Sequence, residues 1–193
     1  MLTKTALFIL GIIADNPINP YAISKLINHK RRNFRAPTHT QTVYSIVNSL
    51  HKKKLISGKR MKNGRMPDRI IYSITQKGQE LLRKNLLSYL SQPEDPLSEL
   101  SVSIFVMGHL DKEAVLMALK EYQRKIKKEI TSRRKLNSEE AEHGVSYSSL
   151  IAIEHTLNIL KVNLNTVNKL INKIETDTQW DRSPIPFWRN EIS

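Results

Sequence analysis

The sequence of 193 residues contains no cysteine, no long hydrophobic run and no internal repeat. The absence of cysteine excludes disulfide scaffolds, thiolate metal sites and cysteine nucleophiles. No stretch approaches the roughly 18 consecutive apolar residues that a membrane-spanning helix needs. The short apolar run from Ala6 to Ala14 has no small-residue cleavage pattern and ends at Asp15-Asn16-Pro17, which argues against a signal peptide. We therefore expect a cytoplasmic protein without a membrane partner.

Motifs of enzymatic and cofactor chemistry are also absent. The six histidines and 18 acidic residues form no HExxH motif, carboxylate cluster or metal-ligand spacing, and no phosphate loop is present. His39 and His51 lack the partners that a metal site or a catalytic site would need. The sequence therefore predicts a protein that is not an enzyme and that binds no metal or cofactor.

Acidic residues are scarce in the first part of the chain. Residues 1–75 hold 14 Lys and Arg but only Asp15 and Asp68, a net charge of +12, whereas residues 76–193 have a net charge of +1. These two segments together make up the net charge of +13. Such a concentrated basic segment indicates a polyanionic partner, either nucleic acid or an anionic membrane surface.

Apolar residues at helical spacing predict three helices before residue 54. The first runs from about Thr3 to Asp15 and the second from Pro20 to about His29, while Thr38 or Thr40 caps a third that ends near Lys53. The residues expected to face the core are Ala6, Ile9, Leu10 and Ile13, then Ile23, Leu26 and Ile27, then Val43, Ile46, Val47 and Leu50. The opposite, polar face of the third helix carries Gln41, Tyr44, Ser45, Asn48 and Lys52.

After Leu55 the apolar period changes from 3.6 to 2, which predicts two strands, Leu55 to Met61 and Arg69 to Ile74. The Asn63-Gly64 dipeptide between them is a strong hairpin signal. The bases on this hairpin are Lys59, Arg60, Lys62, Arg65 and Arg69. Thr75 is expected to cap a fourth helix with Leu82, Leu86 and Leu90 inward. That helix ends before Pro93-Glu94-Asp95-Pro96, so we expect domains at 1–92 and 97–193.

The second domain is predicted to consist of long helices. One starts at Asp111 and carries Val115, Leu119, Tyr122 and Ile126 inward, with the basic runs 124–128 and 133–135 on its outer part. The last helix has eight apolar residues spaced three and four apart, which is coiled-coil spacing: Leu150, Ile153, Leu157, Leu160, Leu164, Val167, Ile171 and Ile174. We expect this stripe to form a dimer seam, the alternative being a helix buried within one chain.

Three helices, a hairpin and a further helix make the order of a winged helix-turn-helix. The predicted fold is therefore mostly α with a small β-hairpin wing, followed by an antiparallel helical or coiled-coil dimerisation domain. In a winged helix the third helix enters the major groove and the wing lies against the flanking backbone, which favours double-stranded DNA as the polyanion. The expected DNA-binding residues are Thr38, His39, Thr40, Gln41, Thr42, Tyr44, Ser45, Asn48, Lys62, Asn63, Arg65 and Arg69.

Several segments resemble the PadR-type bacterial transcription regulators. The run Thr3 to Ile13 looks like the opening of these proteins, and Thr42 to Leu50 resembles their recognition helix, "GTLYPALxxLE". Leu55-Ile56 and Ile71 to Leu82 are similar to the family's "GLI" and "YRLTxKGxxLL". The resemblance implies a winged-helix DNA-binding protein in which Tyr44 contacts a phosphate; packing at the helix–wing contact is the alternative for that residue.

The chain departs from the family pattern at two places. Pro20 precedes Tyr21 where the family's "PxHGY" has glycine, and Gln41-Thr42-Val43 stands where the family has "GTL". These departures leave the fold intact but change the expected DNA contacts, so operator preference does not transfer. Because some family members respond to phenolic acids or planar drugs, the tail aromatics Trp180, Phe187 and Trp188 are candidate residues of an effector pocket, with plain packing as the alternative.

The function that this sequence predicts is a sequence-specific transcriptional regulator. We expect a repressor that binds a pseudo-palindromic operator as a homodimer and that a small aromatic effector relieves. The alternative is a winged-helix interaction module that binds a protein or RNA partner through its helical domain. The two differ in whether Tyr44, Lys62 and Arg65 matter for binding promoter DNA.

Overall fold

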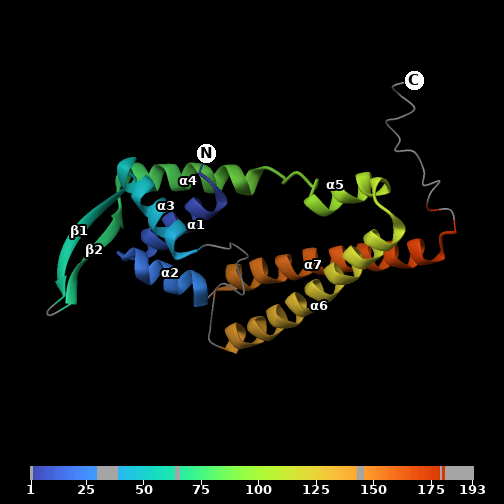
Figure 1. The fold of residues 1–193 in the computed structure, drawn as a ribbon. Helices are drawn as coiled ribbons and strands as arrows, with labels where there is room; N and C mark the ends of the chain where they lie inside the picture. Colours follow the sequence, from blue (N-terminus) through green and yellow to red (C-terminus); the bar gives the residue numbers. More distant parts are fainter. Residues whose placement is uncertain (1, 30–38, 64–65, 143–145, 179, 181–193) are drawn as a thin grey trace, which may run out of the picture. The chain divides into compact units, whose positions relative to one another are not determined.

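The computed structural model describes residues 2–29, 39–63, 66–142, 146–178 and 180 (Figure 1). The chain divides into two compact units, Met1–Glu94 and Asp95–Ser193. The predicted fold class, mostly helical with a small β-hairpin, is confirmed. None of the helices in the described ranges has both the length and the apolar character to cross a membrane.

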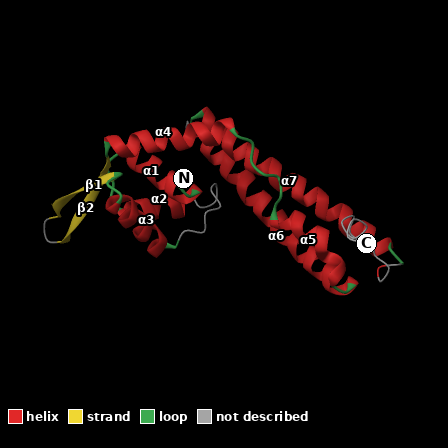
Figure 2. Ribbon diagram, turned by 90° about the horizontal axis from the view of Figure 1, so that it is seen from above, coloured by secondary structure: helices red, strands yellow, loops and turns green. Residues whose placement is uncertain are grey.

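The first unit has the element order of a winged helix. Its elements are α1 (Lys4–Asp15), α2 (Pro20–His29), α3 (Thr40–Lys52), β1 (Ile56–Asn63), β2 (Met66–Ile74) and α4 (Gln76–Ser91). Three helices cluster together and the two-stranded sheet projects away from them, drawn in yellow in Figure 2. Thr3 caps α1 through a 3.2 Å hydrogen bond from the Ala6 amide, so the first helix begins where the sequence predicts.

The core of this unit forms where the predicted helix faces meet. All four predicted residues of α1 are buried, and Val43, Val47 and Leu50 of α3 are buried against them, with Ile46 half-buried at the edge. Tyr72 of β2 joins this core. The backbone of Tyr72 also exchanges two hydrogen bonds with Ile18 in the turn between α1 and α2, at 2.9 and 3.0 Å. This pairing, which the sequence pattern did not reveal, ties the base of the hairpin to the helices.

Three residues predicted to face inward are exposed: Leu26 of α2 and Leu86 and Leu90 of α4. Gly78 lies on the buried side of α4 and packs closely on Leu55, because a Cβ atom at Gly78 would lie 2.1 Å from the Leu55 carbonyl oxygen. Leucines spaced four apart advance about 40° per step around a helix with 3.6 residues per turn. The series that starts at Leu82 therefore leaves the buried face, and Leu90 ends 85% exposed.

The start of α3 also differs from the prediction. The N-cap residue is His39, and its side chain makes no capping hydrogen bond. Thr40 is already inside the helix, where its hydroxyl oxygen accepts a hydrogen bond from the Ser24 hydroxyl of α2 at 3.0 Å. The other predicted cap, Thr38, lies outside the described residues. The hydroxyl that the sequence assigns to capping therefore joins two helices instead.

Hydrogen bonds join the end of α3 to the start of the hairpin and to α4. Lys54 adopts a left-handed backbone conformation with φ of 59°, and the Leu55 amide donates to the Leu50 carbonyl at 3.0 Å. The Thr75 hydroxyl donates to the Leu55 carbonyl at 3.0 Å and accepts from the Gly78 amide at 3.1 Å, so it caps α4 as predicted. This small set of bonds fixes the direction in which the wing leaves the helices.

The strands of the wing are longer than predicted. Their antiparallel register pairs Ile56 with Ile74 at the base and Asn63 with Met66 at the far end, with an irregularity between Met61 and Asn63. Asn63 is therefore the last paired residue of β1, and the link between the strands is residues 64–65, which lie outside the described residues.

The second unit consists of α5 (Glu99–Val106), the short 3-10 helix η2 (Met107–His109), α6 (Lys112–Glu142) and α7 (Tyr147–Thr176). The two long helices run antiparallel and pack along each other (Figure 1). Asp111 caps α6 by accepting from the Ala114 amide at 2.7 Å, which confirms the predicted start. Two apolar clusters join the helices, one around Val115, Leu119 and Val167 and one around Ile126, Ile130 and Leu157.

One residue of the basic runs on α6 is not on the outer face. Arg133 is fully buried, with 0% side-chain exposure, and its Nε donates to the Glu129 carboxylate at 2.8 Å. The prediction that the run 133–135 lies on the outside is therefore wrong for its first residue. Arg133 follows Ile126 by seven positions and Ile130 by three, so helical periodicity places it on the same face as these core residues.

Candidate nucleic-acid interface

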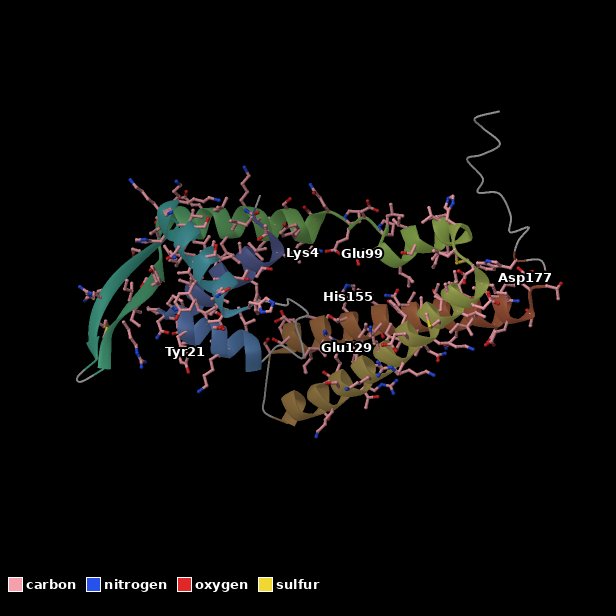
Figure 3. The ribbon with its side chains drawn as sticks, in the orientation of Figure 1. Lys4, Tyr21, Glu99, Glu129, His155 and Asp177 are labelled. Carbon is pink, nitrogen blue, oxygen red and sulfur yellow. The ribbon has the colours of Figure 1, made fainter. Side chains whose placement is uncertain are left out.

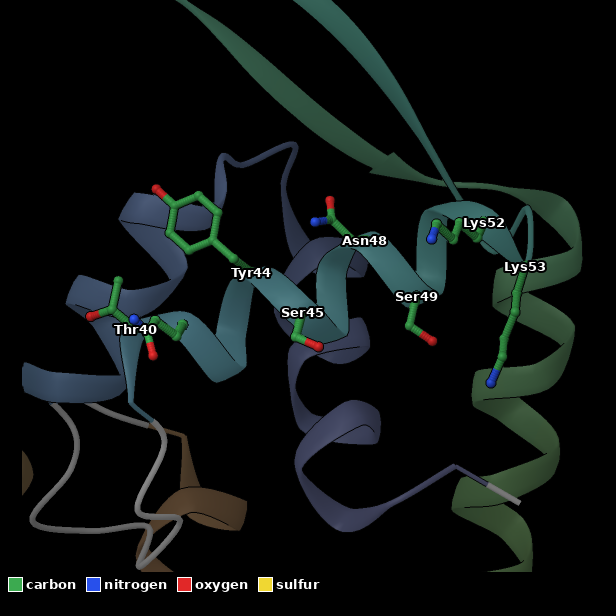
Figure 4. Close-up of a pocket in the computed structure, with 8 residues that line it drawn as sticks. Thr40, Tyr44, Ser45, Asn48, Ser49, Lys52 and Lys53 are labelled. Atoms are coloured by element: carbon green, nitrogen blue, oxygen red, sulfur yellow. The ribbon is translucent and has the colours of Figure 1, made fainter.

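The exposed side of α3 forms the main candidate site. Because Val43, Val47 and Leu50 occupy the buried side, residues three and four positions away from one another line up on the other side. A surface hollow of about 830 Å³ runs along this side (Figure 4). The residues that line it are Thr40, Gln41, Tyr44, Ser45, Asn48, Ser49, Lys52 and Lys53.

The lining residues change in chemistry along the helix. Gln41, Tyr44 and Asn48 are all exposed, and they offer an amide, a phenol and a second amide. Tyr44 and Asn48 project from successive turns on one side of α3, while Ser45 and Ser49 lie on the other (Figure 4). Amide side chains suit recognition of adenine, because they donate and accept hydrogen bonds at once.

The last turn of the site is cationic. Lys52 and Lys53 line the same hollow as the polar residues, at the C-terminal end of α3. The Lys53 carbonyl accepts a hydrogen bond from the Lys77 Nζ of α4 at 3.2 Å, which brings a third base to this end. Cations near a helix C-terminus are favourable for the helix and are also suited to phosphate contact.

The site is built on a rigid support. Val43 and Val47 are 0% exposed, the Ser24–Thr40 hydrogen bond fixes the first turn, and the left-handed Lys54 fixes the last. A recognition surface held in this way loses little conformational entropy when it binds. The local sequence achieves this because β-branched and apolar residues recur at helical spacing on the inner side only.

The wing supplies further bases. Lys59 and Arg60 of β1 and Arg69 of β2 are exposed. In the antiparallel register Arg69 lies opposite Met61, so Arg69 shares a face with Lys59, and this face is the one opposite Tyr72. The side chains of Lys62 and Asn63 and the whole of Arg65 lie outside the described residues.

Seven predicted DNA-binding residues on and beside α3 are exposed in the structure: His39, Thr40, Gln41, Thr42, Tyr44, Ser45 and Asn48. Five of them line the hollow, whereas His39 and Thr42 do not. Thr38 lies outside the described residues. Ser49, Lys52 and Lys53 were missed as contacts. Continuing the spacing from Ser45 to Ser49 and from Asn48 to Lys52 would have found the first two.

The residues predicted for the dimer seam lie along α7. Ile153, Leu157, Leu160, Val167, Ile171 and Ile174 are buried, and they pack against α6 of the same chain, with Leu164 half-buried beside them. Leu150 is half-buried at the start of α7. This packing against α6 matches the alternative of a helix buried within one chain, and the dimer seam stays a prediction.

The candidate effector residues are only partly described. Trp180 is buried in the cluster at the end of α7, and its indole Nε1 donates to the Leu110 carbonyl at 3.1 Å. This placement matches the packing alternative for that residue. Phe187 and Trp188 lie outside the described residues.

Comparison with known families supports the interpretation of the first unit. Residues 9–84 match the model of the transcriptional regulator PadR-like family. The matched segment runs from α1 through the hairpin into α4, so it contains the whole candidate interface. No curated protein sequence matches the chain.

Solved structures resemble nearly the whole chain. PadR of Bacillus subtilis in complex with operator DNA has a TM-score of 0.70 at 14% identity, covering 89% of this chain and 99% of that one. The same protein with p-coumaric acid has a TM-score of 0.63 at 14% identity, covering 89% and 96%. A PadR-like transcriptional regulator from Bacillus cereus has a TM-score of 0.64 at 15% identity, covering 90% and 97%. At this identity the similarity establishes a shared fold.

Proposed function

With residues 9–84 belonging to the PadR-like family of transcriptional regulators, we propose that the chain binds a specific operator through α3. The observation that carries the proposal is the exposed polar side of α3, with Gln41, Tyr44 and Asn48 in one hollow and Lys52 and Lys53 at its end. A structurally similar protein, the Bacillus subtilis PadR, was crystallised with operator DNA. In this proposal residues 1–92 are the DNA-binding domain.

We assign each side chain a base contact or a phosphate contact according to its chemistry. Gln41 and Asn48 face base edges in the major groove, where an amide pairs with adenine through two hydrogen bonds. Tyr44, Lys52 and Lys53 contact phosphates, which position the helix without reading sequence. Lys59 and Arg69, on one face of the wing, neutralise phosphates outside the groove.

We further propose that the protein acts as a homodimer, with residues 97–193 as the dimerisation domain. Exposed apolar residues lie on both sides of the boundary between the two domains: Leu86, Leu87 and Leu90 on α4 of the first domain and Val102, Phe105 and Val106 on α5 of the second are all more than 40% exposed. A twofold dimer would cover such surfaces and would match a pseudo-palindromic operator.

The regulator is proposed to be a cytoplasmic repressor that blocks transcription by occupying its operator. A small aromatic or phenolic effector would relieve it, by analogy with the Bacillus subtilis PadR, which was crystallised with p-coumaric acid. The undescribed tail that contains Phe187 and Trp188 is the candidate for the effector contact.

The test begins with selection of bound sequences from a pool of random duplexes. The proposal predicts a half-site that occurs twice, about one helical turn or a multiple of it apart. Affinity for the selected duplex is expected to fall roughly 10³- to 10⁵-fold between 50 and 200 mM salt, as for a protein making about 6–10 phosphate contacts. Failure to enrich any sequence, or an affinity that is independent of salt, would contradict the proposal and favour the protein- or RNA-binding alternative.

The dimer is tested separately by light scattering. Leu90→Glu on α4 is expected to shift the wild-type dimer towards monomer, because it places a charge in the proposed apolar contact. Arg83→Glu, a charge change at an exposed position of the same helix, is the control and should leave the mass unchanged. A wild-type protein that is monomeric at all concentrations would contradict the homodimer.

A further inference from the structure

Positive charge is concentrated on α6, although the net charge of residues 76–193 is close to zero. Residues 120–135 contain eight Lys and Arg but only two Glu, a net charge of +6. The rest of the segment 76–193 has a net charge of −5, so the sum for the segment is close to zero. A near-neutral second unit therefore contains one strongly basic helix face.

The geometry of α6 places most of these cations on the side away from α7. Leu119, Ile126 and Ile130 occupy the inner side, in the clusters with α7. Side chains with nitrogen tips project from the opposite side of α6 (Figure 3). The basic face is defined by the exposed cations Arg124, Lys127, Lys128, Arg134 and Lys135. From Arg124 to Lys135 the helix rises about 16 Å, at about 1.5 Å per residue.

Both acids within the run are already engaged. Glu121 accepts from Arg124 at 2.7 Å and pairs with Lys125 at 3.3 Å, and these bonds lower the pKa of Glu121 to about 2. Glu129, labelled in Figure 3, bonds to the buried Arg133 at 2.8 Å. Both acids of residues 120–135 are therefore occupied by cations of α6 itself.

Three cations of the basic face have no ion pair among the described residues. Lys120 pairs with Glu175 of α7 at 2.7 Å, but in the described part of the chain no ion pair involves Lys127, Lys128 or Arg134. Like charges on neighbouring turns of a helix destabilise it. A polyanion bound along the face would remove this repulsion and release its own counterions.

The composition of the face discriminates between polyanions. Between Lys120 and Ser138 its outward residues include no aromatic side chain on which a base could stack, which argues against single-stranded nucleic acid. Ile126 and Ile130 of this stretch are buried, so the described part of the face lacks the apolar centre of a protein–protein interface. Evenly spaced cations without either feature are suited to the backbone of a duplex.

We propose that the basic face of α6 binds the sugar-phosphate backbone of duplex DNA outside the segment that α3 contacts. This inference rests on the proposed function, because it extends the DNA contact of the same protein. The helical unit would then contribute to the affinity for DNA of any sequence. Lys127, Lys128 and Arg134 are the residues with the largest expected effect.

The experiment compares three full-length proteins on two duplexes. The variant Lys127→Ala/Lys128→Ala/Arg134→Ala removes three cations of the basic face. The matched control Lys161→Ala/Lys169→Ala/Lys173→Ala removes three exposed cations from α7. The duplexes are the selected operator alone, about 20 base pairs, and the same operator within about 60 base pairs, a length that adds flanking helical turns on both sides.

The expected result is a change in salt dependence on the long duplex only. Each lost phosphate contact lowers the slope of log affinity against log salt by about 0.9, so the variant should lose about 2–3 units of slope per protomer. The control should retain the wild-type slope on both duplexes. Circular dichroism of all three proteins checks that their helical content is the same.

Other outcomes overturn the inference in distinguishable ways. An unchanged slope for the variant on the long duplex, or an equal loss for the control, means that α6 makes no specific backbone contact. Binding to poly-L-glutamate that depends on the basic face, without any such dependence on the long duplex, would assign the face to an acidic protein partner. In each of these cases Asn48→Ala still tests the α3 contact by itself, so the proposed function stands or fails separately.

Discussion

The hydroxyl of Ser24 on α2 donates a 3.0 Å hydrogen bond to the hydroxyl of Thr40, the first residue of α3. Ser24 is buried, with 4% exposure, so this bond lies in the seam where the two helices meet. It orients the helix that carries the candidate interface, although neither residue is needed to form a helix. The recognition surface therefore depends on a part-buried contact at its first turn.

Ser24→Ala is therefore expected to weaken both the fold and DNA binding. The loss of this part-buried hydrogen bond costs about 1 kcal/mol of the free energy of unfolding, because it removes a bond between α2 and α3. Urea unfolding measures this change. Ser57→Ala, at an exposed position of β1, is the control and should change the free energy of unfolding by less than about 0.5 kcal/mol. Equal stability of the two variants would show that the bond does not hold α3.

The two glycines Gly11 and Gly78 are expected to respond oppositely to alanine. A Cβ at Gly78 would lie 2.1 Å from the Leu55 carbonyl oxygen, whereas a Cβ at Gly11 meets nothing within 4 Å. Gly78→Ala should destabilise by about 2 kcal/mol or more, because backbone must move. Gly11→Ala should stabilise by about 0.5–1 kcal/mol, as expected within a helix. Thermal unfolding of the pair checks the signs, and a shift in the same direction would contradict the close approach of α4 to the Leu55 carbonyl.

Replacing Lys54 with glycine is expected to stabilise the fold. Its φ of 59° places it in the left-handed region, which costs a non-glycine residue about 1 kcal/mol or somewhat more. Lys54→Gly should therefore raise the free energy of unfolding by up to about 1 kcal/mol. Lys53→Gly, at a residue with φ of −77°, is the matched control and should give no gain. A loss of stability for Lys54→Gly in urea unfolding would argue against this exit from α3.

Asn48 is expected to determine part of the operator preference. Replacing Asn48 with Ala should cost about 1–3 kcal/mol of discrimination at one base pair and leave non-specific binding nearly unchanged. Tyr44→Phe, in contrast, should weaken binding to all duplexes evenly, because a phosphate contact carries no sequence information. Competition assays with single-base operator variants measure both effects. Asn165→Ala and Tyr147→Phe, on the exposed side of α7, are the controls.

The pH dependence of α6 is expected to centre on Glu121. Hydrogen bonds from Arg124 and Lys125 lower its pKa from 4.5 to about 2. A carboxylate whose folded pKa is depressed contributes stability that is present above its unfolded pKa and is lost as the pH falls through the folded pKa. The contribution should therefore be complete above about pH 4.5 and disappear towards pH 2. NMR titration of the Glu121 carboxyl carbon checks this value, and Arg124→Gln should raise the midpoint.

Most of the local structure was predictable from the sequence, because it depends on neighbours in the chain. The helix starts at Thr3, Thr75 and Asp111 follow from side chains that cap nearby amides. The polar side of α3 follows from 3.6-residue periodicity, which is why Tyr44 and Asn48 were identified correctly as exposed. The change of period after Leu55 similarly predicted the hairpin.

The partners of each face could not be predicted in the same way. Periodicity shows that Leu157 and Ile171 share a side of α7, but the same stripe suits a second copy or another helix of the chain equally well. The structure places α6 against it. Leu90 shows the converse, since an apolar residue expected inside is exposed at the end of α4.

The sequence by itself determined most of the helices, the hairpin, their order and the concentration of charge in the first 75 residues, because these properties depend on local spacing and composition. Only the tertiary structure decided that Thr40 bonds to Ser24, that Arg133 is buried beside Glu129, and that Lys52 and Lys53 share a hollow with Asn48. The physical reason is that burial and hydrogen bonding between elements depend on helix packing and chain direction, which residues distant in sequence set together.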